Sequence, residues 1–140
     1  MNEDLSPPAP LPPPGEGWPL RYKRPESVLV VVYTVAAEVL VLRRRQPPDF
    51  WQSVTGSLRW DETDPLDAAR RELREETGLG DGLDLIASGT INRFPILPPW
   101  RHRYAPGVTH NTEHVYSLAV PAPLPVTLNP REHLRHRWLP

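Results

Sequence analysis

Three glutamates, Glu72, Glu75 and Glu76, have the spacing that brings side chains together on one face of a helix. Glu72 and Glu76 have no basic residue three or four positions away, so on a helix they would repel each other. A cluster of this kind requires a cation from elsewhere, either an arginine or a metal ion. Its ligands would all be oxygens, which favour magnesium, manganese or calcium over zinc. Magnesium bound in this way usually also contacts substrate phosphates, so the pattern indicates phosphoryl chemistry.

The helix that would carry these glutamates is predicted over Pro65–Thr77. Asp64 is a good N-cap, proline suits the first helical position, and Gly78 follows the last turn, where a left-handed cap favours glycine. The other two faces would be apolar and basic, formed by Leu66, Ala69 and Leu73 and by Arg70, Arg71 and Arg74. A solvated helix with salt bridges is the simpler interpretation. It accounts for Asp67, Arg71 and Glu75 at spacing four, but not for Glu72 or Glu76.

Extended segments flank this helix on both sides and provide the rest of the predicted fold. The expected strands are residues 28–34, 39–42, 50–55, 83–92, 113–120 and 133–139, with a hairpin turn at 36–38. Strands before and after a single helix predict a mixed α+β domain.

Length and composition exclude several classes of protein. A chain of 140 residues suits one domain, and a net charge of −1 gives no overall field that would indicate nucleic acid or a membrane as partner. The absence of cysteine excludes thiolate metal sites and fits the cytoplasm. No apolar run approaches the roughly 20 residues of a membrane helix, and no secretory signal is recognisable. Seven of the 20 prolines precede Leu20, so residues 1–20 are predicted to form a disordered tail before a domain at 21–140.

The residues around the acidic face resemble the Nudix box, the motif of the Nudix hydrolases. The family pattern is glycine, five residues, glutamate, seven residues, then arginine, glutamate, aliphatic, any, glutamate, glutamate, any, glycine, aliphatic. Here it is filled by Gly56, Glu62, Arg71, Glu72, Leu73, Glu75, Glu76, Gly78 and Leu79. Eight residues, rather than seven, separate Glu62 from Arg71. The extra residue precedes the acidic face, so the helix register is kept, but the family role of Glu62 in bracing the loop becomes an open question.

Segments outside the box are similar to the Nudix subfamily that hydrolyses dihydroneopterin triphosphate. They are residues 22–25, 49–57, 101–109, 111–113 and 132–134. The box alone indicates a Nudix hydrolase, and these flanking segments indicate the subfamily.

The resemblance implies three groups of site residues. The metal ligands would be Glu72, Glu76 and Glu132, with Glu113 as the alternative to Glu132. The catalytic residues would be Arg71, which orients Glu72, and Glu75, which acts as a ligand or base. The substrate contacts would be Lys23, Arg44, Thr55 and Phe94.

The expected fold is α+β, a Nudix-like α/β/α sandwich with a mixed sheet. The family chain continues past the segment matching Trp138-Leu139 into a further helix. This chain stops at Pro140, so the C-terminal helix is expected to be missing. The implied reaction is Mg²⁺-dependent hydrolysis of dihydroneopterin triphosphate to the monophosphate and pyrophosphate, in folate biosynthesis, with Mn²⁺ as a substitute.

Three alternatives to this function remain open. A Nudix enzyme could act on ordinary nucleoside triphosphates, because the catalytic helix contacts only metal and phosphate. A non-catalytic Nudix-fold binding module is the second, although it would be expected to lose the box carboxylates. An adaptor that uses the proline-rich tail is the third, but it would need no acidic face. The expected partner is a small-molecule triphosphate, and the sequence does not determine the oligomeric state.

Overall fold

Strand β1 (Glu26–Thr34) is the central strand of a mixed sheet. The computed structural model describes residues 22–80 and 82–140, so the tail predicted at 1–20 lies outside the described residues. Along β1, Val28, Val30 and Val32 are fully buried because alternate side chains of a strand point to the same face. The core of the domain therefore lies on this face of the sheet.

The remaining strands surround β1 in a mixed arrangement. They are β2 (Val39–Arg44), β3 (Trp51–Gln52), β4 (Val54–Ser57), β5 (Ile86–Pro95), β6 (His110–Val120) and β7 (His133–Leu139). β6 pairs in parallel with β1 along its whole length, and β5 extends the sheet beyond β6. On the other side, β4 and then β2 pair antiparallel with β1, while β3 and β7 pair with β2.

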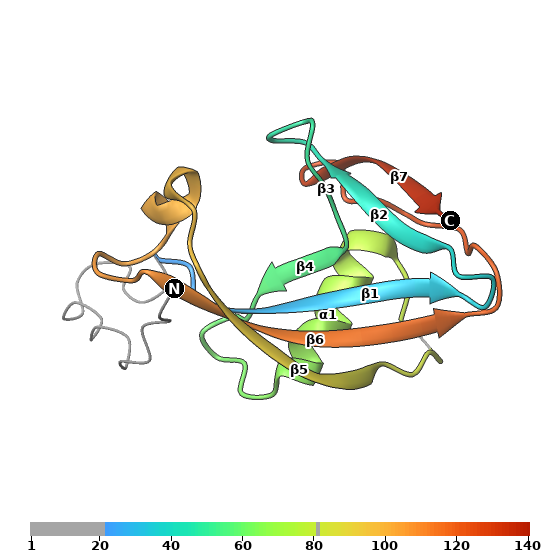
Figure 1. Cartoon of the computed structure of the whole chain (residues 1–140), viewed down its shortest axis with the longest axis horizontal. Coiled ribbons are helices and arrows are strands. Elements are labelled where there is room, and N and C mark those ends of the chain that lie inside the picture. Colours follow the sequence, from blue (N-terminus) through green and yellow to red (C-terminus); the bar gives the residue numbers. More distant parts are fainter. Residues whose placement is uncertain (1–21, 81) are drawn as a thin grey trace.

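The sheet divides where β2 leaves β1. The two strands share only the pair Tyr33 and Val39 at the hairpin, whereas residues 27–30 of β1 pair with β4 instead. Figure 1 shows β2 and β7 turning away from β1 above the centre of the molecule. Side chains of both β1 and β2 line the cavity described below.

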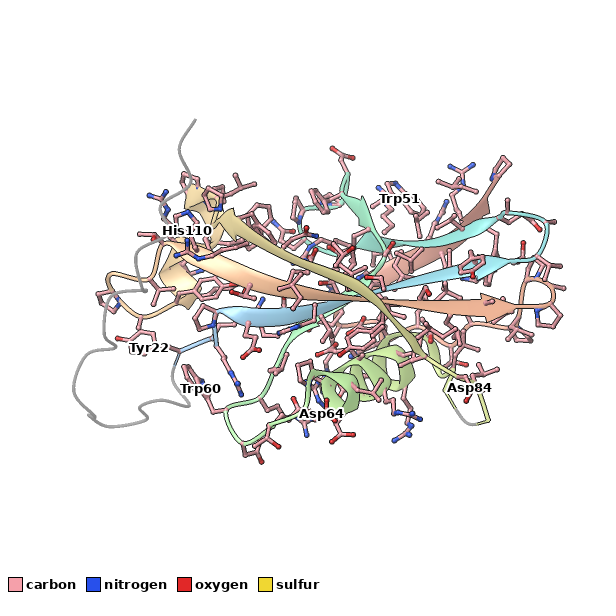
Figure 2. The ribbon with its side chains drawn as sticks, turned by 60° about the horizontal axis from the view of Figure 1, so that its bottom comes forward. Tyr22, Trp51, Trp60, Asp64, Asp84 and His110 are labelled. Carbon is pink, nitrogen blue, oxygen red and sulfur yellow. The ribbon has the colours of Figure 1, made fainter. Side chains whose placement is uncertain are left out.

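Helix α1 (Pro65–Thr77) lies against the face of the sheet that carries the core (Figure 2). The predicted caps are confirmed. The side chain of Asp64 accepts a hydrogen bond of 3.0 Å from the backbone of Leu66, and Gly78 adopts φ 74°. Ala68, Ala69 and Leu73 are buried against the sheet. The helix therefore presents its apolar face to the core, as its periodicity predicts.

Two local expectations differ from the structure. Residues 50–55 were expected as one strand, but β3 and β4 are separate and pair with β2 and β1, respectively, because those two strands diverge. A short 3₁₀ helix, η1 (Pro98–Arg103), was not predicted. It begins with two prolines, which lack the backbone N–H that a strand ladder requires.

The predicted fold class is confirmed as α+β with a mixed sheet. Within residues 22–80 and 82–140, α1 is the only α-helix, and β7 is the last element in the order. In this part of the chain, no helix is long and apolar enough to cross a membrane.

Candidate active site

A cavity of about 950 Å³ lies between the two parts of the divided sheet and the η1 region. All but one of the predicted site residues line it, namely Lys23, Arg44, Thr55, Glu72, Glu75, Glu76, Phe94 and Glu132. Glu113, the alternative metal ligand, also lines it. Arg71 is not among the lining residues, so it can act there only through the side chains that it contacts.

The carboxylate of Glu72 lies directly against Gly56 in β4. A Cβ atom at Gly56 would overlap the terminal carbon and both oxygens of the Glu72 side chain. Glycine is therefore required at the first position of the box because a side chain approaches the backbone closely. Only 8% of Glu72 is exposed, so this approach also buries its charge.

Arg71 connects the loop before α1 to the acidic face. Its Nε and Nη2 donate to the two carboxylate oxygens of Glu62, at 3.1 and 2.7 Å, and Nη2 also donates to the backbone oxygen of Ser57 at 3.0 Å. Its Nη1 donates to Glu72 at 2.8 Å and to Glu75 at 3.2 Å. The extra loop residue therefore leaves the pair of Glu62 and Arg71 intact. The expectation that Glu72 lacks a basic partner on its own helix is wrong, because the long arginine side chain reaches its neighbour.

Burial and ion pairing have opposite effects on the carboxylates of this network. Burial raises the pKa of Glu72 to about 7, with smaller contributions from Glu75 and Glu76, and Arg71 only partly offsets this rise. The hydrogen bond from Arg71 lowers the pKa of Glu62 below its ordinary value. For Arg71, burial acts to lower the pKa, but the bond to Glu62 and the charge of Glu72 raise it on balance.

We expect the metal-free protein to lose stability relative to its Glu72→Gln variant as the pH rises from 4.5 to about 7. A pKa raised on folding means that the stabilisation is fully present below the ordinary pKa and is lost as the pH passes the folded-state value. The difference should reach roughly 1–3 kcal/mol and level off above pH 7. Urea unfolding of both proteins in chelator, at several pH values, measures it. A difference that does not change with pH would contradict the assignment.

Glu76 and Glu72 together fit the carboxylate half of a metal site. Glu76 is 6% exposed, and its Oε2 lies 2.5 Å from Nδ1 of His133, at angles outside those of a well-formed hydrogen bond. Burying a carboxylate charge is unfavourable unless hydrogen bonds or a cation compensate it. Among the described residues, however, no three His, Cys, Asp or Glu side chains already form a complete metal cluster. Magnesium typically takes few carboxylates and completes its shell with water and phosphate oxygens.

The two candidates for the third ligand differ in their surroundings. Glu113 accepts a hydrogen bond of 3.3 Å from Asn92, its neighbour across the pair of β5 and β6. Glu132 lies in the turn before β7, where its backbone N–H donates to Asn129. Its side chain receives no hydrogen bond from the described residues and is near enough to Lys23 to raise the pKa of that amine. Among the described residues, the carboxylate of Glu113 thus has a hydrogen-bond donor, whereas that of Glu132 has none.

A cluster of cations, Lys23, Arg44 and Arg103, lines the same cavity as these carboxylates. Burial lowers the pKa of Lys23, and the nearby charges of Arg103 and Arg44 lower it further, while Glu72 and Glu132 oppose them. The Lys23 amine also lies 5.9 Å from the centre of the Tyr104 ring. Cations that converge in spite of mutual repulsion form a binding site for an anion. Arg103 was not predicted, although it lies within the subfamily-like segment 101–109.

Aromatic side chains line another part of the cavity. Phe50 and Trp100 come from separate segments and meet edge to face, with ring centroids 6.2 Å apart. Phe94 is 39% exposed, which places it at the surface of the cavity. Thr55 is another predicted substrate contact. Its hydroxyl already donates a hydrogen bond of 2.9 Å to the backbone oxygen of Val28. Neither Phe50 nor Trp100 was predicted, since a single exposed aromatic residue carries no sequence signal for a pocket.

The chain resembles known proteins over most of its length. The NUDIX domain family matches residues 23–140. Dihydroneopterin triphosphate diphosphatase of Escherichia coli is 48% identical over 122 residues, which cover 84% of this chain and 79% of the relative. The Haemophilus influenzae diphosphatase of the same name is 42% identical over 124 residues, covering 86% and 77%. The solved structure of the E. coli dihydroneopterin triphosphate pyrophosphohydrolase matches with a TM-score of 0.77 at 48% identity, covering 84% of this chain and 82% of that structure.

The chain therefore belongs to the Nudix hydrolase family, as the box predicted. Nudix hydrolases generally require a divalent metal ion.

Proposed function

We propose that this Nudix hydrolase cleaves dihydroneopterin triphosphate to dihydroneopterin monophosphate and pyrophosphate. One observation carries the proposal: a single cavity combines buried carboxylates, a cluster of cations and exposed aromatic rings. These are the groups needed for a metal ion, a phosphate chain and a flat ring, respectively. Relatives that bear the name of this activity share 42% and 48% of their residues with this chain over most of its length.

In the proposed reaction, water attacks a phosphorus, the anhydride bond between the α- and β-phosphates breaks, and pyrophosphate leaves. Glu72, Glu76 and Glu132 would hold Mg²⁺, or Mn²⁺ as a substitute. The bound ion would neutralise phosphate charge and lower the pKa of water. Arg71 keeps the carboxylate of Glu72 in place through its 2.8 Å contact. Glu75, 40% exposed and held by Arg59 and Arg71, is the carboxylate that accepts the proton of the attacking water.

The cations and the rings bind the two ends of the substrate. Lys23, Arg44 and Arg103 neutralise the phosphate chain, and their fixed positions require no rearrangement as charge shifts during the reaction. Phe50 and Trp100 supply flat apolar surface on which a pterin ring can stack. Because the metal ligands cannot distinguish one triphosphate from another, this outer part of the cavity sets the preference for the substrate.

Catalysis is proposed to reside in residues 21–140. The described residues that line the cavity begin at Lys23, and the family match begins at the same residue. The cysteine-free composition fits our placement of the reaction in the cytoplasm.

We expect dihydroneopterin triphosphate to be cleaved more efficiently than guanosine triphosphate, with pyrophosphate as the inorganic product. A ring that fits its pocket can gain about 10- to 200-fold in kcat/KM over one that does not. Both compounds should be offered in one tube with magnesium, while pyrophosphate and orthophosphate are followed separately. Equal cleavage of both would remove the pterin assignment but leave a Nudix hydrolase. Orthophosphate as the only product would contradict the proposed bond cleavage, and turnover in excess chelator would contradict the metal requirement.

A further inference from the structure

We propose that His133 is a positioning residue that orients the carboxylate of Glu76 for metal binding. This inference rests on the proposed function, because it assigns His133 a part in the same metal site. His133 was not singled out from the sequence, although it directly follows Glu132. The inference goes beyond the carboxylates themselves and names the side chain that holds one of them.

His133 lies where three parts of the site meet. It is the first residue of β7, it pairs with Arg44 of β2, and its backbone N–H donates to Asn129 at 2.9 Å. Only 3% of the residue is exposed, so its imidazole must form its hydrogen bonds with protein groups and not with solvent. Its covalent neighbour is the proposed ligand Glu132, and its ring faces the end of α1. One residue therefore connects the ligand on the helix with the ligand on the loop.

The contact with Glu76 is short. Nδ1 of His133 lies 2.5 Å from Oε2 of Glu76, although the angles are outside those of a well-formed hydrogen bond and neither atom has another such bond within the described residues. Two buried lone pairs cannot approach this closely without a proton or a cation between them. The ring of His133 can supply that proton itself.

Gln52 determines which ring nitrogen carries the proton. Its side-chain nitrogen lies 3.2 Å from Nε2 of His133, on the side of the ring opposite Glu76. With the amide nitrogen in this position, Gln52 donates and Nε2 accepts, which places the proton of the neutral ring on Nδ1. Gln52 therefore makes Nδ1 the donor toward Oε2 of Glu76. This contact restrains the rotation of the carboxylate and leaves its other oxygen for a cation, the usual role of a side chain behind a metal ligand.

Two substitutions of His133 separate this role from simple packing. Asparagine places its amide nitrogen near the former Nδ1, facing Glu76, whereas glutamine places it near the former Nε2, facing Gln52. Both are neutral, polar and smaller than histidine. We expect His133→Gln to weaken the binding of Mn²⁺, measured by calorimetry on the full chain, by about 10- to 100-fold, and His133→Asn to stay within a few-fold of wild type. We expect kcat to fall in the same order, with His133→Asn close to wild type and His133→Gln well below it.

The same pair of substitutions in a Glu76→Gln background provides the control. If His133 acts through Glu76, the difference in Mn²⁺ affinity between the asparagine and glutamine variants should disappear there. Melting temperatures without metal record how far each variant destabilises the fold. Equal affinities for the two variants in the Glu76 background would overturn the inference, even if both variants are destabilised.

A measurement on the wild-type protein covers the case in which a variant fails to fold. The ¹⁵N shifts of the His133 ring in the metal-free protein should show a protonated Nδ1 and an unprotonated Nε2. The opposite tautomer would overturn the inference. If wild type binds no divalent metal and hydrolyses no triphosphate, the proposed function itself fails. If it does both while the two variants match it, only the role of His133 fails.

Discussion

Replacing Glu76 by glutamine is expected to lower kcat/KM by about 100- to 1000-fold, the scale of losing one essential electrostatic group in an active site. The carboxylate is 6% exposed and shares one helix face with Glu72, so neutralising it removes a like-charge repulsion from the metal-free protein. Glutamine has nearly the same shape, and its oxygen can still accept from His133. Stability without metal should therefore stay constant or rise slightly, in contrast to activity.

The two effects are measured by magnesium-dependent turnover and by urea unfolding in chelator. Asp67→Asn is the matched control, because Asp67 lies on the exposed side of the same helix and outside the cavity. It should leave turnover within a few-fold of wild type. Unfolding of Glu76→Gln under conditions where wild type is folded would show that Glu76 is structural and would refute its assignment as a ligand.

Replacing Arg71 by leucine is expected to cost about 1–3 kcal/mol of folding stability, because removing one partner of a half-buried ion pair leaves the other partly uncompensated. The Arg71 side chain is 16% exposed and that of Glu62 is 14% exposed, and they share two hydrogen bonds. Glu72 loses its 2.8 Å contact in the same variant. Activity should therefore fall even at temperatures where the variant remains folded.

Arg70→Leu is the control for this second prediction, since Arg70 is adjacent in sequence but exposed to solvent. Its unfolding midpoint in urea should lie close to that of wild type. Arg71→Lys should recover only part of the loss, because lysine keeps the charge but cannot form the two-pronged contact with Glu62. A loss below about 1 kcal/mol for Arg71→Leu, the range of exposed ion pairs, would mean that the network does not hold the loop to the helix.

The sequence by itself determined the features that depend on neighbouring residues. The bounds of α1 followed from Asp64, Pro65 and Gly78, because caps act within one helical turn. The acidic face followed from spacings of three and four residues. The Nudix box and its flanking segments were sufficient to identify the family. The extra loop residue did not affect this prediction, because it precedes the helix and leaves the register of Glu72 and Glu76 unchanged.

Only the tertiary structure decided what faces these glutamates. The strand expected at residues 50–55 is divided because its halves pair with β1 and β2, and pairing between distant segments leaves no local pattern. For the same reason the sequence did not identify Arg103, Phe50 and Trp100 as parts of the cavity. The contact between His133 and Glu76 joins residues 57 positions apart, from 76 to 133. Local spacing thus predicts which side chains share a face, whereas the folding of the sheet decides which faces meet.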